Sequence, residues 1–265
     1  MIFVIDIGNT HTVAGIFDHG KISKKWRIKT DNSMTADELV ISYHNLFSIS
    51  GIDTELIYGI IMSSVVPQLE GDYFSAFTTL FPLVTESHIF RVNSRNVSGL
   101  IKICLDNPAE VGADRLVNGI AAFNLCGTGS IVIDFGTAIT FDCISSRCEY
   151  LGGLILPGLK IALQALTEKT AKLPQIDISV PPEKVIGTCT VSAMKSGVMN
   201  GYGAMVEGLI AKISTEMRSA VSGDISIIAT GGMAALIKPF APSIQRVEPD
   251  LTLHGLFYIF NKLNS

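Results

Sequence analysis

Charged side chains are scarce in this 265-residue chain. Aspartate, glutamate, lysine and arginine make up 17% of its residues, against roughly 25% in an ordinary soluble domain. Apolar residues reach about 55% when glycine is counted and tyrosine omitted, against a usual value of roughly 45–50%. Disorder requires low hydrophobicity and high net charge, so this composition excludes it. A large core, a subunit interface or a membrane must therefore cover the excess apolar surface.

The sequence also lacks a membrane-spanning run. The longest uncharged stretch, residues 116–133, contains Asn118, Asn124 and the turn-like residues 127–130. Glycine and proline interrupt the other apolar runs, and none provides the roughly 20 continuous apolar residues of a spanning helix. The chain starts directly with an apolar run, without the basic leader of a signal peptide. We expect a cytoplasmic protein with no membrane partner.

Paired cysteines and basic clusters are missing as well. The five cysteines are an odd number without metal-type spacing, which predicts free thiols in a reducing compartment. They are Cys104, Cys126, Cys143, Cys148 and Cys189. The net charge is −4, and no basic block is present. Nucleic acid is therefore not expected as a partner.

A short motif occurs twice. Residues 2–10 form an apolar run that ends in Asp6-Ile-Gly-Asn-Thr10, and residues 131–137 form another that ends in Asp134-Phe-Gly-Thr137. The two aspartates are about half a chain apart. This repeat predicts a duplicated domain, with residues 1–118 in the first copy and residues 119–265 in the second.

The segments after each motif also correspond. Predicted strands 12–17 and 22–28 flank a turn in the first half, and strands 138–144 and 150–155 flank a turn in the second. Further predicted elements are helices over 35–49, 110–124 and 191–217 and strands over 57–63 and 225–230. Thr35 and Glu38 form a capping-box pattern at the start of the first helix. We expect an α/β fold with two mixed, helix-covered sheets and a cleft between the domains.

The repeated motifs are suited to binding phosphate. Gly8 and Gly136 permit tight hairpins whose backbone N–H groups can approach an anion. Asp6 and Asp134, at the strand ends, could hold a cation or its water. Either motif alone is common in ordinary hairpins, but the pair favours two loops that grip a polyphosphate and Mg²⁺ between them. Gly231 and Gly232 follow a third apolar strand and either approach a flat nucleobase or form an ordinary turn.

An acid–arginine pair lies in an otherwise apolar segment, Gly112-Ala113-Asp114-Arg115. A carboxylate there could accept a proton from a substrate hydroxyl during phosphoryl transfer. Arg115 could bind a substrate carboxylate with two hydrogen bonds. The alternative is an ion pair on a helix surface or between domains.

Taken in order, these motifs resemble those of the type III pantothenate kinases, the bacterial family that phosphorylates pantothenate at the start of coenzyme A synthesis. The resemblance extends from Ile2 to about Leu256. It implies two duplicated ribonuclease H-like (actin-like ATPase) domains with mixed five-stranded sheets, as in the acetate and sugar kinase superfamily. The remaining markers are Gly152-Gly153, Pro157-Gly158, Lys172-Leu173-Pro174 and Pro249-Asp250-Leu251.

The resemblance also implies roles for individual residues. The implied ATP-binding residues are Asp6, Ile7, Gly8, Asn9, Thr10, His11, Thr12, Val13, Thr137, Gly231 and Gly232. The implied pantothenate-binding residues are Gly112, Ala113, Asp114, Arg115 and Thr190, with Asp114 as general base and Thr190 supplied across a dimer interface. Asp134 corresponds to the ligand of a required K⁺ or NH₄⁺ ion, and Asp6 to an Mg²⁺ ligand that can act through water. Leu105-Asp106-Asn107 stand where many members have a substrate-contacting tyrosine.

Two other functions are compatible with the same motifs. One is a different small-molecule kinase or a phosphatase of the superfamily, although the short chain and the Gly112–Arg115 motif weigh against it. The other is a family member that has lost catalysis and acts as an accessory factor for transcription. The three aspartates Asp6, Asp114 and Asp134 favour a kinase. The apolar composition and the sparsely charged segment 191–217 predict a homodimer.

Overall fold

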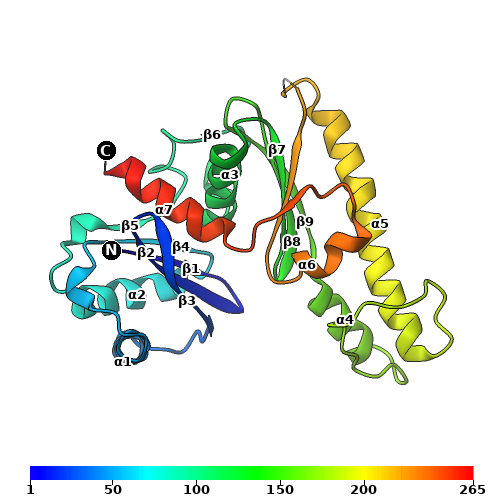
Figure 1. Cartoon of the computed structure of the whole chain (residues 1–265), viewed down its shortest axis with the longest axis horizontal. Helices are drawn as coiled ribbons and strands as arrows, with labels where there is room; N and C mark the ends of the chain where they lie inside the picture. Colours follow the sequence, from blue (N-terminus) through cyan, green and yellow to red (C-terminus); the bar gives the residue numbers. More distant parts are fainter. Residues whose placement is uncertain (222, 265) are drawn as a thin grey trace. The chain divides into compact units, whose positions relative to one another are not determined.

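The computed structural model describes residues 1–221 and 223–264 (Figure 1). It divides into two compact units. The first comprises residues 1–121 and 251–265, and the second comprises residues 122–250. The first unit therefore includes the end of the chain, whereas the duplicated motif had placed residues 119–265 together in the second domain.

The first unit contains a mixed five-stranded sheet in the order β3-β2-β1-β4-β5. Strand β1 pairs antiparallel with β2 and parallel with β4, which in turn pairs parallel with β5. The strands are β1 (Ile2–Ile7), β2 (His11–Asp18), β3 (Lys21–Lys29), β4 (Gly59–Ser64) and β5 (Ile89–Arg91), and a short strand β6 (Lys102–Ile103) follows. The meander predicted from the sequence is confirmed. The turn between β2 and β3 has positive φ angles at His19 and Gly20, as a two-residue hairpin requires.

Helices cover both faces of this sheet. Alternate β1 residues Phe3 and Ile5 belong to the core that also holds Tyr43, Phe47 and Phe77 from α1 (Ala36–Ser50) and α2 (Pro67–Leu80). On the opposite face lies α7 (Leu251–Leu263). The ring of its residue Phe260 occupies the position that a Cβ atom on Gly59 would take. Both faces are thus buried, which explains why β1 is a continuous apolar run. The predicted capping box of α1 is confirmed, because Thr35 and Glu38 bond reciprocally.

The second unit repeats this design with an aliphatic core. Its strands are β7 (Ser130–Phe135), β8 (Ala138–Ile144), β9 (Glu149–Pro157), β10 (Ser226–Thr230) and β11 (Arg246–Val247). These five pair in the order β11-β10-β7-β8-β9, with β7 antiparallel to β8 and parallel to β10. Ile131 and Ile133 on β7 belong to one core with Val206 and Ile210 of the long helix α5 (Thr190–Met217). Strands β1 and β7 have the same sequence of buried and half-buried positions, which confirms the predicted duplication.

Three further helices complete the chain. Helix α3 (Ala113–Cys126) connects the two units along the chain. Helices α4 (Leu159–Glu168) and α6 (Ala234–Ile237) belong to the second unit. The predicted helix over 110–124 is confirmed with a later start, because Pro108–Glu110 forms a separate 3₁₀ turn.

Candidate functional site

The first glycine hairpin joins β1 to β2. The N–H of Gly8 donates to the carbonyl of His11 at 3.2 Å, and this bond leaves Asn9 and Thr10 as an exposed two-residue turn. A Cβ on Gly8 would lie 2.9 Å from that same carbonyl oxygen, so a side chain there would push the hairpin open. Ile7 pairs with Thr12 in the ladder. The predicted phosphate loop, residues 6–13, is therefore a real hairpin at the end of a buried strand.

Asp6 lies one residue before the last residue of β1. It is half-buried, and its carboxylate accepts a hydrogen bond of 2.7 Å from the hydroxyl of Ser63. Ser63 is the register partner of Asp6 on the parallel strand β4. Val13 is its partner on β2. The sheet thus holds the carboxylate at its edge, where a hydrated cation can reach it.

Asp114 lies in the first turn of α3, where the positive end of the helix dipole favours a carboxylate. Its Oδ1 accepts a 2.8 Å hydrogen bond from the N–H of Arg115. Burial raises the pKa of Asp114, and the bond and charge of Arg115 oppose that rise. The result is a partly buried carboxyl with a basicity above that of an ordinary aspartate.

Gly112 gives Asp114 its place. A Cβ on Gly112 would come within 2.5 Å of the Asp114 Oδ1 atom, so a side chain there would displace the carboxylate from this position. The same Cβ would lie 3.5 Å from Val65, whose N–H donates to the carbonyl of Ile7 at 3.0 Å. Gly112 therefore lies near Val65, the residue that bonds to the last residue of β1. Sequence separation alone gave no indication of this contact.

The segment before Gly112 uses its polar side chains locally. The carbonyl oxygen of the Asn107 side chain accepts from the N–H of Ala109 at 3.2 Å, and its amide donates to Glu110 at 2.9 Å. These bonds start the 3₁₀ turn that precedes Val111. Asn107 thus shapes the backbone that leads into Gly112.

The second glycine hairpin joins β7 to β8 and is one residue shorter. The N–H of Gly136 donates to the carbonyl of Ala138 at 3.1 Å, which leaves Thr137 alone at the exposed tip. Asp134 is half-buried at the strand end, like Asp6, and its register partner on the parallel strand is Thr230. The two hairpins are therefore equivalent in register although they differ in length.

Gly231 lies directly against this hairpin. Its φ angle is +87°, and a Cβ there would come within 2.3 Å of the Asp134 Oδ1 atom and 2.7 Å of the Phe135 backbone. The neighbouring Gly232 is exposed. Gly231 thus packs closely against the Asp134 carboxylate and the Phe135 backbone, and a side chain at position 231 would collide with both.

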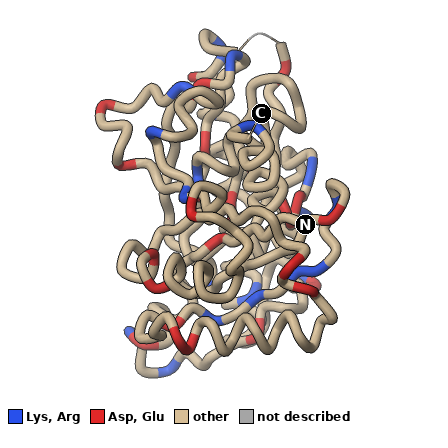
Figure 2. Tube along the Cα trace, turned by 90° about the vertical axis from the view of Figure 1, so that its left-hand side faces the viewer, with Lys and Arg blue, Asp and Glu red and all other residues tan. Residues whose placement is uncertain are grey.

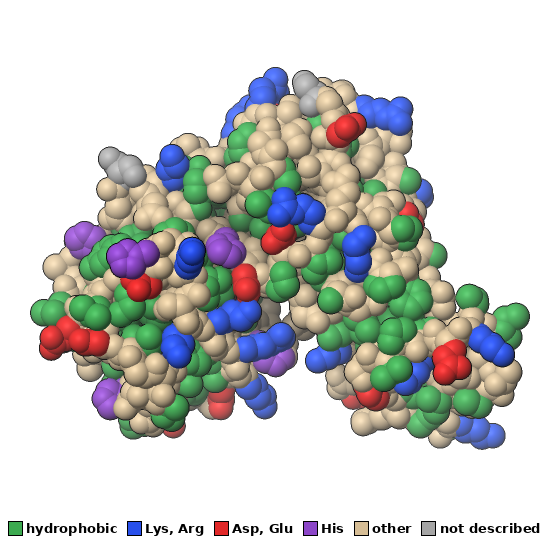
Figure 3. Space-filling model, viewed as in Figure 1, with side chains coloured by type: hydrophobic (Ala, Val, Ile, Leu, Met, Phe, Trp, Pro, Cys, Tyr) green, Lys and Arg blue, Asp and Glu red, His purple; other side chains and the backbone are tan. Residues whose placement is uncertain are grey.

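Thr190 is the exposed first residue of α5, in the second unit. The side-chain hydroxyl of Ser192 accepts a hydrogen bond from the N–H of Cys189 and so caps the start of this helix. The loop before it passes close to the helix, since a Cβ on Gly187 would clash with the backbone of Ala193. Several hydrophobic side chains near this helix start and around α4 are exposed (Figure 3): Ile155, Ile161, Leu166, Val180, Val185, Ile186 and Val191.

Figure 2 shows acidic and basic positions interspersed along the trace, in keeping with the absence of a basic block in the sequence.

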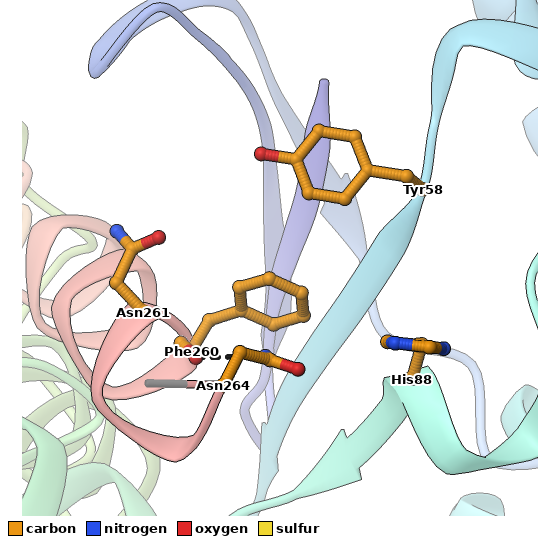
Figure 4. A pocket seen from close by; sticks show the side chains of 5 residues that line it. All are labelled: Tyr58, His88, Phe260, Asn261 and Asn264. Atoms are coloured by element: carbon orange, nitrogen blue, oxygen red, sulfur yellow. Dashed lines mark hydrogen bonds between the residues drawn. The ribbon is translucent and has the colours of Figure 1, made fainter.

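A cavity of about 430 Å³ in the first unit is lined by Tyr58, His88, Phe260, Asn261 and Asn264 (Figure 4). None of its lining residues belongs to the predicted site. The amides of Asn261 and Asn264 donate to carbonyls of α7 itself.

Two searches of the described residues gave negative results. Within residues 1–221 and 223–264, no helix has the length and apolarity needed to cross a membrane. Across the same ranges, no three His, Cys, Asp or Glu side chains are grouped so as to hold a metal ion. None of the five cysteines, all of which are described, forms a disulfide bond.

Comparisons with known proteins agree on one family. Residues 2–212 match the family model described as type III pantothenate kinase. A type III pantothenate kinase of Desulfotalea psychrophila is 46% identical over 263 residues, with 99% of this chain and 98% of the relative covered. One of Desulfatibacillum aliphaticivorans is 43% identical, with 100% of both chains covered.

Solved structures share the fold at low sequence identity. Component A of the (R)-2-hydroxyglutaryl-CoA dehydratase of Acidaminococcus fermentans matches with a TM-score of 0.52 at 13% identity, and all of both chains is covered. A conserved protein of the Baf transcriptional activator family from Campylobacter jejuni matches with a TM-score of 0.57 at 17% identity, and 98% of both chains is covered. At these identities the two structures show the fold alone.

Proposed function

The chain belongs to the type III pantothenate kinase family, and from that premise we propose that it transfers the γ-phosphoryl group of ATP to the primary hydroxyl of pantothenate. The products are 4'-phosphopantothenate and ADP, and the reaction is the first step of coenzyme A biosynthesis. The observation that carries this proposal is that Gly112, two residues before Asp114, lies near Val65, whose N–H bonds to the last residue of β1. This link within the first unit supports a proton acceptor close to the proposed phosphate loop.

Asp114 acts as the general base in this proposal. Its carboxylate accepts the hydroxyl proton of pantothenate while the hydroxyl oxygen forms a bond to the γ-phosphorus, and the bond between that phosphorus and the β–γ bridging oxygen breaks. Burial raises the pKa of Asp114, which makes its carboxylate a better acceptor at neutral pH. Gly112 leaves room for the carboxylate, and the proposed role of Arg115 is to bind the carboxylate of pantothenate.

The hairpins bind the nucleotide in this proposal. The exposed turn at Asn9 and Thr10 offers backbone and side-chain donors of the first hairpin to the phosphates, and Thr137 offers those of the second. The hydroxyl of Thr12, predicted as an ATP contact, is buried and bonds within the first unit instead. Gly231 and Gly232 accept the adenosine against bare backbone. Phosphoryl transfer depends mostly on alignment and charge neutralisation, and donor-rich turns provide both.

The cations fit the residues that are present. Mg²⁺ in kinases is held by one or two carboxylates together with substrate phosphates and water, rather than by an all-protein cage. Asp6, anchored by Ser63 at the sheet edge, meets that requirement. Asp134, half-buried at the end of β7, would supply a carboxylate oxygen to a K⁺ or NH₄⁺ ion. When bound, the two ions would neutralise phosphate charge.

The proposal includes a cytoplasmic homodimer in which Thr190 of one copy contacts pantothenate bound to the other. Support comes from the hydrophobic side chains exposed around α4 and the start of α5, such as Ile155 and Ile186, which are 69% and 82% exposed. Patches of this kind commonly mark protein interfaces. Free cysteines agree with a reducing compartment.

One assay tests substrate, reaction and cation together. ADP release is measured with ATP and Mg²⁺, with pantothenate, glucose or acetate as acceptor, and with K⁺ or Na⁺ as the added salt. We expect ADP release that requires pantothenate and is far higher with K⁺. Release with glucose or acetate but not with pantothenate would identify another kinase of the superfamily, and no release with any acceptor would favour the accessory-factor alternative. Equal rates in K⁺ and Na⁺ would contradict the role given to Asp134.

A further inference from the structure

A chain of side-chain hydroxyls lies beneath the first hairpin. Thr30 follows β3 directly, and its hydroxyl donates to the carbonyl of Gly8 at 2.6 Å. Its backbone N–H donates to the carbonyl of Thr10 at 3.0 Å. The hydroxyls of Thr30 and Thr12 are 3.0 Å apart, and the hydroxyl of Tyr73 donates to that of Thr12 at 3.4 Å.

The direction of every bond in this chain can be assigned. A hydroxyl has one proton, and that of Thr30 is used on the Gly8 carbonyl. The hydroxyl of Thr12 must therefore donate to Thr30, and it receives the proton of Tyr73 in turn. Thr12, Thr30 and Tyr73 are all buried, at 0%, 8% and 4% exposure. Bonds that run in one direction away from water strengthen one another.

This series of hydrogen bonds ends at the carbonyl of Gly8 and so determines the direction of the next N–H, that of Asn9. The carbonyl of Gly8 is held toward Thr30. In a planar trans peptide the C=O and the following N–H point in opposite directions. The N–H of Asn9 is therefore directed away from Thr30, on the open side of the hairpin.

We infer that Thr30 is a positioning residue for nucleotide binding: it fixes the Gly8–Asn9 peptide so that the Asn9 N–H meets a phosphate of ATP. Thr12 and Tyr73 orient the Thr30 hydroxyl from behind. Thr30 itself does not contact the nucleotide. This inference rests on the proposed function, because it takes the first hairpin as the phosphate loop.

The test compares ATP affinity in variants of the full-length protein by isothermal titration calorimetry. Thr30→Val keeps the shape and removes the hydroxyl, and we expect it to weaken ATP binding about tenfold, the size of one neutral hydrogen bond. Thr30→Ser restores the hydroxyl and should bind ATP like the wild type. Thr78→Val is the matched control, because its hydroxyl bonds only within α2 of the same unit, to the carbonyl of Ser75.

Kinetics distinguish positioning from general damage. Thr30→Val should raise KM for ATP and leave KM for pantothenate unchanged, whereas a misfolded site would change both. An unchanged ATP affinity in Thr30→Val, or a loss in Thr30→Ser as large as in Thr30→Val, overturns the inference. If Thr30→Val fails to fold, Tyr73→Phe answers the question: weaker ATP binding supports the inference and unchanged binding overturns it.

A failure of the proposed function would be visible separately. A wild-type protein that binds ATP but does not phosphorylate pantothenate would refute the proposed reaction, and the calorimetric comparison would still decide the role of Thr30.

Discussion

The hairpin between β1 and β2 and the hairpin between β7 and β8 start from strands with the same burial pattern and an aspartate at the same position. Each aspartate faces a hydroxyl-bearing residue on the neighbouring parallel strand, Ser63 beside Asp6 and Thr230 beside Asp134. The supports differ. Buried hydroxyls hold the first hairpin, whereas the glycines Gly231 and Gly158 pack against the backbone of the second.

Duplication has kept some features of the two hairpins the same and has allowed others to change. The strand, its register and the aspartate are retained in both copies. The turn and its support have diverged, so only the support of the first hairpin is expected to depend on side-chain hydroxyls, and that of the second on the absence of a Cβ at Gly231 and Gly158. Asp114 belongs to the same unit as the first hairpin.

The largest expected effect is the loss of turnover when Asp114 is replaced. Asp114→Asn should lower kcat by at least about 10²-fold, because general-base assistance is typically worth that much or more. ATP affinity should not change, since the hairpins remain intact. Steady-state kinetics and calorimetry measure both quantities. Asp37→Asn, the same substitution in the first turn of α1, is the matched control and should retain activity. Near-normal turnover in Asp114→Asn would remove this residue from the mechanism.

The two repeated aspartates should differ in which ion they affect. Asp134→Asn should lower activity at least about tenfold in K⁺ and remove the advantage of K⁺ over Na⁺, because the monovalent site loses its charge. Asp6→Asn should instead raise the Mg²⁺ concentration needed for half-maximal rate and keep the preference for K⁺. Titrations of both ions with each variant measure this, and identical profiles would mean that the two hairpins have not diverged in function.

A methyl group at Gly231 should destabilise the second hairpin. Gly231→Ala places a Cβ 2.3 Å from Asp134 at a φ of +87°, and we expect it to lower the free energy of unfolding by about 2–3 kcal/mol. Denaturant unfolding measures the loss. Gly197→Ala is the control in α5, where the new Cβ meets open space; it should be neutral or gain up to about 1 kcal/mol. A Gly231→Ala variant as stable as the wild type would show that the second hairpin does not depend on close glycine packing.

The smallest effects concern pH. The pKa of Asp114 is raised above its ordinary 3.8, so the acid limb of the kcat profile should lie above that value and disappear in Asp114→Asn. A raised aspartate pKa costs stability above the folded-state pKa, because ionisation is harder in the folded than in the unfolded chain. Asp114→Asn should therefore have a slightly higher Tm at neutral pH. The difference should shrink as pH falls through the raised folded-state pKa and vanish below the ordinary value of 3.8. A lower Tm at neutral pH would contradict burial as the cause.

Much of this arrangement could be predicted from the sequence. The repeated apolar strands, the hairpin turns and the capping box of α1 are local patterns, and the structure contains all of them. Helix α2 gave a weak signal, because Gly71, Thr78 and Thr79 lower helix propensity. Helix α7 is apolar on most of its surface, so its periodicity did not reveal which unit it would join.

The parts of the site that the sequence did not predict depend on contacts between residues far apart in the chain. Thr30 and Tyr73 have ordinary neighbours in the sequence, and only the fold brings them beneath Gly8 and Thr12. The approach of Gly112 to Val65 likewise depends on how the start of α3 packs in the first unit. Motifs revealed which residues carry chemistry, whereas tertiary contacts determine which residues hold them in place.

The return of α7 to the first unit has a consequence for synthesis on the ribosome. The second unit is one continuous segment, residues 122–250, and can fold as soon as it emerges. The first unit lacks the helix that buries Leu253, Leu256 and Phe260 until residues 251–265 have been made. Domains usually fold from the N-terminus onward, but here the N-terminal sheet is translated first and completed last. A stalled or shortened chain would leave one face of β1 and β4 exposed to chaperones and proteases.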